Sequence, residues 1–344
     1  MRPLMGGQTT LPVSNCAPIA TFVLDNRGVA RDYATVRVLL VGASGQVGSP
    51  LARRLSRDGH DVVATADPRA AGRARHLDPQ LDIAPVDLLD LAGMQRLLHT
   101  SDADVFYLLT DNTAQPPSDC GSIFKDRRSV KRAVSFYNDV APLLVNAALQ
   151  RGCRKIIAGS HTAAFTPGST VRREIDVMWK DGPGLLGQLA RATERFEEAT
   201  NAVGGVILRY GTPTGPGTYY APDGRDIDAI SRGRFRLPED ARGYQSFIHV
   251  RDAVNASVAA LTAAKGTYHI VGDSVQARKW VPTVAEYLNV DPPRHVNAVW
   301  YAGPLRMRKH MLTASAPVAA DQTYKKLGWL PTLPTWQQQI LTPL

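Results

Sequence analysis

The stretch VRVLLVGASGQVG, residues 36–48, predicts the fold of this chain. Its first part, 36–41, is a nearly continuous apolar run, which is typical of a short strand buried on both faces of a sheet. Three glycines follow, and residues 50–57 then have the pattern of a helix. In such a unit the first glycine permits a tight turn, the second lets the backbone approach a pyrophosphate, and the third lets the helix pack on the strand. The helix N-terminus offers free N–H groups to the phosphates. Rather than a merely glycine-rich turn, we therefore predict a dinucleotide-binding turn with contacts from Gly42, Ser44, Gly45, Gln46, Val47 and Gly48.

Strand and helix patterns alternate from this turn onward. Further strands are expected at 61–66, 81–86, 103–109, 154–158 and 205–209, and helices at 141–150 and 185–201. This alternation indicates βαβ units, so the expected fold class is α/β with a Rossmann-like, doubly wound parallel sheet. We expect 1–35 to be a flexible N-terminal extension and 36–211 to be the dinucleotide-binding domain. Residues 212–344 would form a smaller substrate-binding region, part of which returns to the first domain.

Composition argues against several classes of protein. The 344 residues are 44% hydrophobic and 21% charged, an ordinary globular balance. No apolar stretch reaches the roughly 18 residues of a membrane span, so no membrane association is expected. The cysteines at 16, 120 and 153 are far apart and have no histidine at ligand spacing, so neither a disulfide framework nor a metal site is predicted. Such cysteine usage fits a reducing, cytoplasmic compartment, and 16–24 is a poor match to a secretory signal.

The net charge of +9, with a pI near 9.6, raises the question of nucleic-acid binding. The basic residues are scattered in twos and threes, however, and no run of them is interleaved with aromatic residues. No nucleic-acid-binding motif is present either. We therefore expect no nucleic acid as partner, and a field that favours an anionic cofactor and a small-molecule substrate.

The choice between NAD and NADP depends on the end of the second strand. Asp67 lies 19 residues after Gly48, close to the spacing of an acid that bonds the ribose 2′-hydroxyl of NAD. Arg69, followed by arginines at 73 and 75, suits the 2′-phosphate of NADP instead. Because the small Ala66 leaves room for a phosphate, NADP(H) is favoured slightly over NAD(H).

Several motifs resemble those of one family when taken together. Residues 206–217, VILRYGTPTGPG, are similar to its ILRPxxxYGPG, and 246–253, SFIHVRDA, to its DFIHVDDVA. Residues 326–331, KLGWLP, are similar to its closing KLGWxP, and 38–48 to its glycine motif. With these motifs in the expected order over 36–340, the chain resembles the extended, epimerase/dehydratase-like group of the short-chain dehydrogenases/reductases. The resemblance implies a Rossmann domain with a C-terminal substrate region, and a possible homodimer.

The resemblance also implies further cofactor contacts. In the family an acid usually stands where this chain has Ala66, which adds to the uncertainty over Asp67. Asp87 and Leu88 resemble the pair that flanks adenine, with an ordinary strand-to-helix cap as the alternative. The remaining positions lie at the carboxyl ends of strands, where ligands bind in such sheets. They are Leu109, Thr110, Tyr210, Thr212 and Pro213.

The chain departs from the family at the catalytic pair. Members carry a YxxxK motif in which the tyrosine exchanges a proton and the lysine lowers its pKa. No tyrosine after the glycine turn has a lysine four residues on. Residues 186–194, LGQLARATE, match the family's YGxSKxxxE in spacing, with Leu186 in place of the tyrosine and Ala190 in place of the lysine. The usual acid–base chemistry is therefore lost, whereas hydride transfer is kept, since the cofactor carries the reactive C–H bond.

The family's catalytic hydroxyl position has changed as well. Counting back from Phe165, where the family has a tyrosine, places His161 at that position, with Ser160 and Thr162 on either side. Each could bond a substrate oxygen, and His161 is expected to titrate near neutral pH. The alternative is that the hydroxyls only satisfy backbone groups of the turn. Ser160, His161 and Thr162 are the candidate catalytic residues.

Aromatic and basic residues gather in the region that covers the substrate in this family. Tyr219, Tyr220, Phe235 and Tyr244 suit a flat aromatic substrate, and the arginines at 225, 232, 234 and 236 suit nucleotide-sugar phosphates. Core aromatics under a solvated loop are the alternative.

Three functions remain open on the sequence. The favoured one is an NAD(P)H-dependent ketoreductase that acts on a ketone of a secondary metabolite such as an aromatic polyketide. It resembles angucyclinone-type ketoreductases, which lack the same catalytic residues, and its proton would come from substrate or water. The alternatives are a nucleotide-sugar epimerase or dehydratase, and a non-catalytic NADP-binding regulatory protein.

Overall fold

The computed structural model of the chain describes residues 23–24, 30–31, 35–68, 81–109, 130–297 and 306–342. Contacts divide the chain into two units, 1–35 and 36–344. In the first unit β1 (Val23–Leu24) pairs antiparallel with β2 (Ala30–Arg31). The larger unit holds the functional site, and the rest of this description concerns it.

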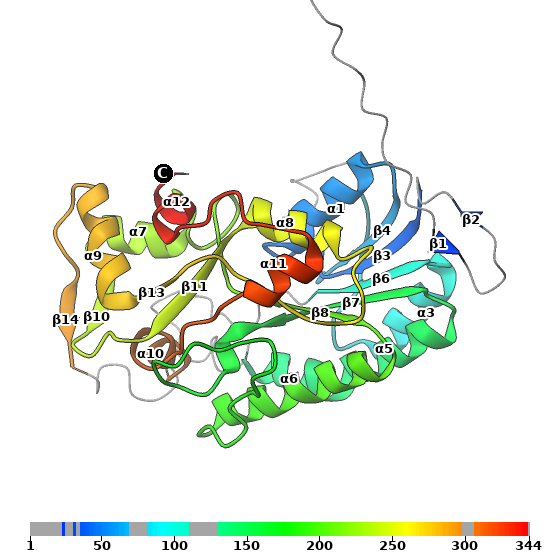
Figure 1. Ribbon diagram of the computed structural model, residues 1–344, viewed down its shortest axis with the longest axis horizontal. Coiled ribbons are helices and arrows are strands. Elements are labelled where there is room, and N and C mark those ends of the chain that lie inside the picture. The colour runs from blue at the N-terminus through cyan, green and yellow to red at the C-terminus, as the bar shows by residue number, and fades with distance from the viewer. Residues whose placement is uncertain are drawn as a thin grey trace, which may run out of the picture. The chain divides into compact units, whose positions relative to one another are not determined.

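A parallel sheet of seven strands forms the centre of the larger unit (Figure 1). Its order is β12-β8-β7-β6-β3-β4-β5, so the chain reverses direction along the sheet between β3 and β6. Ligands bind at such a switch point, beyond the carboxyl ends of the strands. The predicted fold class is confirmed. The strands are β3 (Arg37–Val41), β4 (Asp61–Ala66), β5 (Asp82–Pro85), β6 (Val105–Leu108), β7 (Lys155–His161), β8 (Val206–Tyr210) and β12 (Gly266–Ile270).

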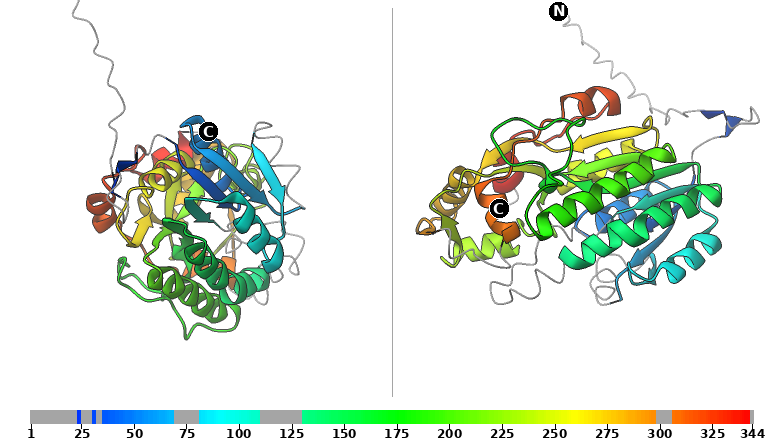
Figure 2. Two further views of the ribbon diagram at one scale, coloured as in Figure 1. Left: turned by 90° about the vertical axis from the view of Figure 1, so that its right-hand side faces the viewer. Right: turned by 90° about the horizontal axis from the view of Figure 1, so that it is seen from below.

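Helices cover both faces of this sheet because its strands are apolar on both sides. α1 (Gly48–Arg57) and α8 (Val250–Ala259) pack together on one face. α3 (Leu91–Ser101), α5 (Ala141–Gln150) and α6 (Leu185–Ala202) cover the other (Figures 1 and 2). Side chains from alternate strand positions therefore fill two apolar cores, one containing Leu40 and the other Leu39.

A third apolar core lies beyond the sheet, in the C-terminal part of the chain. Trp280 is fully buried there, and the rings of Tyr220, Phe235 and Phe247 pack edge-on against it. Tyr220 and Phe235 are thus core aromatics, which agrees with the alternative to a substrate-binding role given in the sequence analysis. The elements around them are β9 (Thr212–Thr214), α7 (Arg225–Ser231), β10 (Arg236–Pro238), β11 (Tyr244–His249), β13 (Ser274–Gln276), α9 (Ala277–Tyr287), β14 (Arg294–Val296), α10 (Arg306–Thr313) and α12 (Trp336–Leu341).

The last part of the chain also returns to the sheet. β12 pairs with β8 as the edge strand, and α11 (Asp321–Leu327) packs beside it. None of the helices in the described ranges is long and apolar enough to cross a membrane. Of the cysteines only Cys153 is described, and burial raises the pKa of its thiol to about 11, as befits a small buried residue.

Candidate active site

The glycine turn brings backbone segments too close together for side chains. Gly42 has a φ of +98°, and a Cβ atom there would lie 1.9 Å from the carbonyl oxygen of Leu109. A Cβ atom at Gly48 would lie 2.0 Å from the carbonyl oxygen of Gly42. α1 starts at Gly48. Its N-cap residue is Val47, whose side chain makes no capping hydrogen bond. The positive end of a helix without a side-chain cap, beside a close backbone turn, suits a dinucleotide pyrophosphate, so these residues fit such a cofactor.

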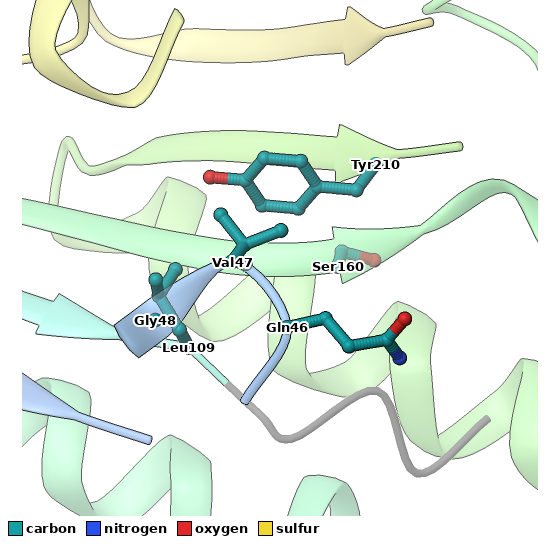
Figure 3. A pocket seen from close by; sticks show the side chains of 7 residues that line it. Gln46, Val47, Gly48, Leu109, Ser160 and Tyr210 are labelled. Atoms are coloured by element: carbon teal, nitrogen blue, oxygen red, sulfur yellow. The ribbon is translucent and has the colours of Figure 1, made fainter. Parts of the chain in front are cut away.

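A pocket opens next to this turn, at the carboxyl ends of β6, β7 and β8 (Figure 3). Gly159 has no room for a side chain, because a Cβ atom there would lie 2.8 Å from the Leu109 side chain. The absence of a side chain at Gly159 thus lets Leu109 and the Tyr210 ring lie close to the backbone of β7. Its described lining is Gln46, Val47, Gly48, Leu109, Gly159, Ser160 and Tyr210.

The Tyr210 phenol is not available as a proton donor in this pocket. Its hydroxyl lies 2.7 Å from Ser257 Oγ, and the Ser257 hydroxyl donates in turn to the Ala253 carbonyl oxygen. Tyr210 must therefore donate its proton to Ser257. Burial raises the pKa of Tyr210 well above its usual range. The ring thus serves as an apolar wall of the pocket.

An ion pair that the sequence did not suggest links the ends of β4 and β5. Arg132 Nη2 lies 3.2 Å from Asp67 Oδ2 and also contacts Asp87 Oδ1. The Asp87 carboxylate also accepts the Leu89 N–H at 2.8 Å, and it therefore caps the turn before α3 as well. Leu88 is buried in the core. Arg69, the expected 2′-phosphate residue, lies outside the described residues.

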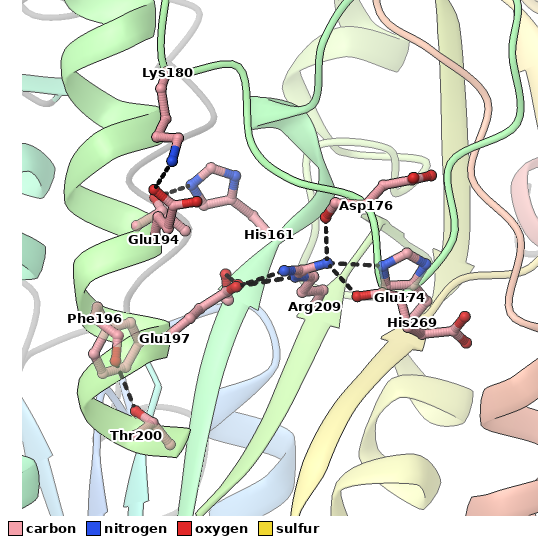
Figure 4. A network of polar contacts seen from close by, with 12 residues as sticks. His161, Glu174, Asp176, Lys180, Glu194, Phe196, Glu197, Thr200, Arg209 and His269 are labelled. Carbon is pink, nitrogen blue, oxygen red and sulfur yellow. Dashed lines mark hydrogen bonds and ion pairs between the residues drawn. The ribbon is translucent and has the colours of Figure 1, made fainter. Parts of the chain in front are cut away.

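Ser160 bonds the ion pair of Glu197 and Arg209, which is buried and is shown in Figure 4. Its hydroxyl donates to Glu197 Oε1 at 2.6 Å, and Arg209 donates to both oxygens of the same carboxylate, with Nη2 2.7 Å from Oε2. The side chains of Arg209 and Glu197 are 8% and 5% exposed, so this pair is out of contact with bulk water. Because the Ser160 proton is engaged, Ser160 links β7 to α6 and β8 instead of offering a free donor.

His161 is also buried, and it belongs to β7 rather than to the turn after it. The ring is 4% exposed, its Nε2 lies 3.3 Å from Thr193 Oγ1, and its buried Nδ1 has no hydrogen-bond partner. Burial, helped by the charge of Arg209, lowers the pKa of His161 to about 4. The expectation that this imidazole titrates near neutral pH is therefore wrong. His161 is a neutral group with one nitrogen unused.

Thr162 is the most available of the three candidate catalytic side chains. It begins the short 3-10 turn Thr162–Ala164 and is partly buried. Its hydroxyl makes one long contact, 3.4 Å to the Tyr210 carbonyl oxygen. A substrate oxygen would therefore compete with only a weak bond.

The two positions that the sequence analysis assigns to the tyrosine–lysine pair hold apolar side chains in apolar surroundings. Ala190 is fully buried among Phe165, Met178 and Val271, and Leu186 packs partly buried against the core beneath the sheet. Apolar residues thus surround the position that the sequence analysis assigns to the lysine.

The remaining predicted cofactor residues are placed as follows. Thr212 and Pro213 lie on β9 and pair with β11, and neither is among the described lining of the pocket. Thr110 lies outside the described residues. In the described ranges no three His, Cys, Asp or Glu side chains are grouped as metal ligands.

Two functional contacts escaped the sequence analysis. Glu197 stands on the α6 face that also carries Leu186 and Thr193, and an acid on that otherwise buried face was a usable signal. The Tyr219 N–H donates to Gln46 Oε1 at 3.3 Å, which joins the substrate region to the glycine turn. Nothing in the spacing of these two residues could have indicated that contact.

Comparison with known proteins gives a consistent set of relatives. The family described as the NAD dependent epimerase/dehydratase family matches residues 38–163. The 3-diazoavenalumate denitrifying reductase of a Streptomyces species is 33% identical over 316 residues, which span 88% of this chain and 98% of that protein. The UDP-N-acetyl-alpha-D-glucosaminuronate decarboxylase of Bacillus cytotoxicus is 25% identical over 242 residues, 65% of this chain and 71% of that protein.

Solved structures share the fold. A UDP-glucose 4-epimerase from Thermotoga maritima, solved with UDP-glucose, superposes with a TM-score of 0.69 at 17% identity, covering 89% of this chain and 96% of that one. A Bordetella bronchiseptica enzyme in complex with NAD⁺ gives a TM-score of 0.66 at 18% identity, covering 90% and 96%.

Proposed function

Because this chain belongs to the NAD-dependent epimerase/dehydratase family and is an NAD(P)-dependent oxidoreductase, we propose that it is a reductase whose substrate accepts hydride without a proton from the enzyme. One observation carries the proposal. By motif spacing, Leu186 and Ala190 take the places of the family's proton-exchanging pair. Both side chains lie in apolar surroundings, and the polar groups nearby are already engaged or neutral. Ser160 donates to Glu197, Tyr210 donates to Ser257, and His161 is uncharged.

The glycine turn would hold the pyrophosphate of the cofactor, and the pocket lined by Leu109, Gly159 and Tyr210 would receive the nicotinamide ring. The bound dihydronicotinamide supplies the hydride. We propose NADP(H) as the cofactor. Ala66 leaves room for a 2′-phosphate, and the Arg132 guanidinium, 3.2 Å from Asp67, weakens the repulsion that this acid would exert on one.

An aromatic diazonium group is the acceptor that best suits a site without a proton donor. When its ring carbon gains hydride, a C–H bond forms, the C–N bond breaks and its electron pair leaves with dinitrogen. The reaction consumes one hydride and no proton. The Streptomyces relative is named for such a denitrifying reduction of a diazo compound, which supports the same class of substrate here.

A ketone of an aromatic, polyketide-like metabolite is the second candidate. Hydride would add to the carbonyl carbon, and the oxygen would take its proton from a phenol or enol of the substrate or from water. Thr162 favours this candidate, because its hydroxyl makes only the 3.4 Å contact and is free to bond a carbonyl oxygen. Positioning of the reacting atoms would then supply much of the rate acceleration.

Turnover with NADPH deuterated at nicotinamide C4 tests the proposal. We expect a diazotised hydroxycinnamate to lose dinitrogen and to carry one deuterium at the former C–N carbon. An aromatic polyketide ketone is assayed in parallel, where the label would appear at the carbinol carbon. Deuterium from heavy water at the reacting carbon, or saturable NADPH binding without turnover of either substrate class, would overturn the proposal.

A further inference from the structure

The side chain of Gln46 connects the glycine turn to the turn that contains Tyr219. The Tyr219 N–H donates to Gln46 Oε1 at 3.3 Å. Because a backbone N–H can only donate, the amide atom that faces it must be the oxygen, and this fixes which way the amide group is turned. The Nε2 amino group of Gln46 is therefore directed away from the Tyr219 backbone.

This amino group is available to a ligand. Within the described part of the chain, Nε2 of Gln46 has no hydrogen-bond partner. The residue is partly buried and lines the pocket, and Nε2 is not sealed from solvent. In Figure 3 the Gln46 side chain extends from the glycine turn with its amide end away from the Tyr210 hydroxyl. A ligand in the pocket can therefore accept a hydrogen bond from Nε2.

Gln46 differs in this respect from the rest of the described pocket lining. Two other lining residues have polar side chains, Ser160 and Tyr210, and each hydroxyl proton is already donated to another side chain. The remaining residues of that lining are apolar or glycine. Among the described lining residues, Gln46 thus provides the one side-chain donor with protons to spare.

A carboxamide donor suits a reduction in which the enzyme gives no proton. Its N–H group stabilises negative charge on an oxygen, as glutamine and asparagine side chains do in oxyanion holes. An amide N–H is nevertheless far too weak an acid to transfer its proton at neutral pH. In the two candidate substrates, the oxygen to be bound is the ketone carbonyl or a ring hydroxyl next to the carbon that bears the diazo group.

We propose that Gln46 is a specificity-determining residue of the active site, whose Nε2 donates to a substrate oxygen on or next to the carbon that gains hydride. The Tyr219 N–H holds the amide in this orientation, and the turn at Tyr219 borders the bound substrate. The inference rests on the proposed function, which supplies the class of substrate. The competing acceptor is the cofactor itself, and the experiment separates the two.

Ligand pairs that differ by one oxygen test the proposal on the enzyme with NADP⁺ bound. The first pair is para-hydroxycinnamate, the product expected from a hydroxycinnamate diazotised next to its hydroxyl, and cinnamate. The second pair is α-tetralone and tetralin. For the unaltered enzyme we expect the oxygen to raise the affinity about fivefold in one pair, as for one hydrogen bond. Gln46→Met keeps the side-chain length without an N–H group, so both members of that pair should bind it equally well.

A merely structural role for Gln46 would weaken both members of a pair alike and leave their ratio unchanged. Gln46→Leu also lacks the donor and covers the case in which the methionine variant unfolds. The matched control is Gln276→Met, at a glutamine outside the described pocket lining, which should keep the ratio of the unaltered enzyme.

Two results would overturn the inference. One is a ratio that survives in both Gln46 variants or is absent from the unaltered enzyme in both pairs. The other is a loss of NADPH affinity in the Gln46 variants with the ratio intact, because the amide would then serve the cofactor. Turnover of the diazo or ketone substrate is scored separately, so failure of the proposed function is distinguishable from failure of this inference.

Discussion

Glu197 and Arg209 form the most consequential contact at the scale of single residues. Both are almost fully buried, and Ser160 and Arg209 bond the same carboxylate. Glu197→Gln would leave a buried guanidinium without its counter-charge, which costs about 3–5 kcal/mol. Urea denaturation measures this loss of unfolding free energy. Glu194→Gln is the control, because its pair with Lys180 is half-exposed and worth about 0–1 kcal/mol. Equal losses in the two variants would contradict the prediction.

The neutral state of His161 makes a prediction for the rate profile. With a pKa of about 4, the ring does not change charge between pH 5.5 and 8, a window set roughly by that value. We therefore expect kcat/KM to show no ionisation attributable to this histidine across the neutral range. Initial rates measured for the enzyme and for His161→Gln test this. A step near pH 6.5 that disappears in the variant would show that the imidazole is accessible after all.

These residues also show which parts of the candidate site could be predicted from the sequence. Position counting found Ser160 and His161, because motifs fix the order of residues along a strand. It did not find Glu197, whose meeting with Ser160 depends on how α6 lies over the end of β7. The error about the His161 pKa has the same origin, since burial is a property of the packed molecule.

At the scale of elements, the turn from β3 to α1 requires glycine for two separable reasons. Gly42 and Gly59 have similar φ values of +98° and +92°, but only at Gly42 would a side chain collide with backbone. Gly59→Ala is expected to cost about 1–2 kcal/mol from backbone strain alone and to keep cofactor binding. Gly42→Ala should lose NADPH binding measured by fluorescence titration. If both variants bind NADPH equally well, the close approach to Leu109 is not needed.

Element boundaries were predicted well where periodicity was strong. β4 and α5 begin and end at the predicted residues, because each is an apolar run next to a glycine, Gly59 before β4 and Gly152 after α5. β7 continues to His161, three residues beyond the expected end, since the polar side chains there are paired by buried partners from other elements. The closure of the apolar cluster around Ala190 was likewise invisible, because it assembles residues from distant parts of the chain.

At the scale of the whole molecule, three buried histidines make stability depend on pH. Burial is the first cause that lowers the pKa values of His161, His269 and His310 to about 4, from an ordinary 6.5. Between these values the unfolded chain binds more protons than the folded one, so stability falls as the pH falls from 6.5 to 4. Urea midpoints across this range measure the effect. A midpoint that stays constant down to pH 4 would show that the three rings are solvated.

The hydrogen bond between Tyr219 and Gln46 has a thermodynamic consequence for the entire catalytic cycle. If the glycine turn receives the dinucleotide and the turn at Tyr219 contacts the substrate, as proposed, this bond joins the two loops, and ordering one lowers the entropy cost of ordering the other. Positive cooperativity between the two ligands follows. By reciprocity, the factor by which the dinucleotide raises the affinity for substrate equals the factor by which the substrate raises the affinity for the dinucleotide.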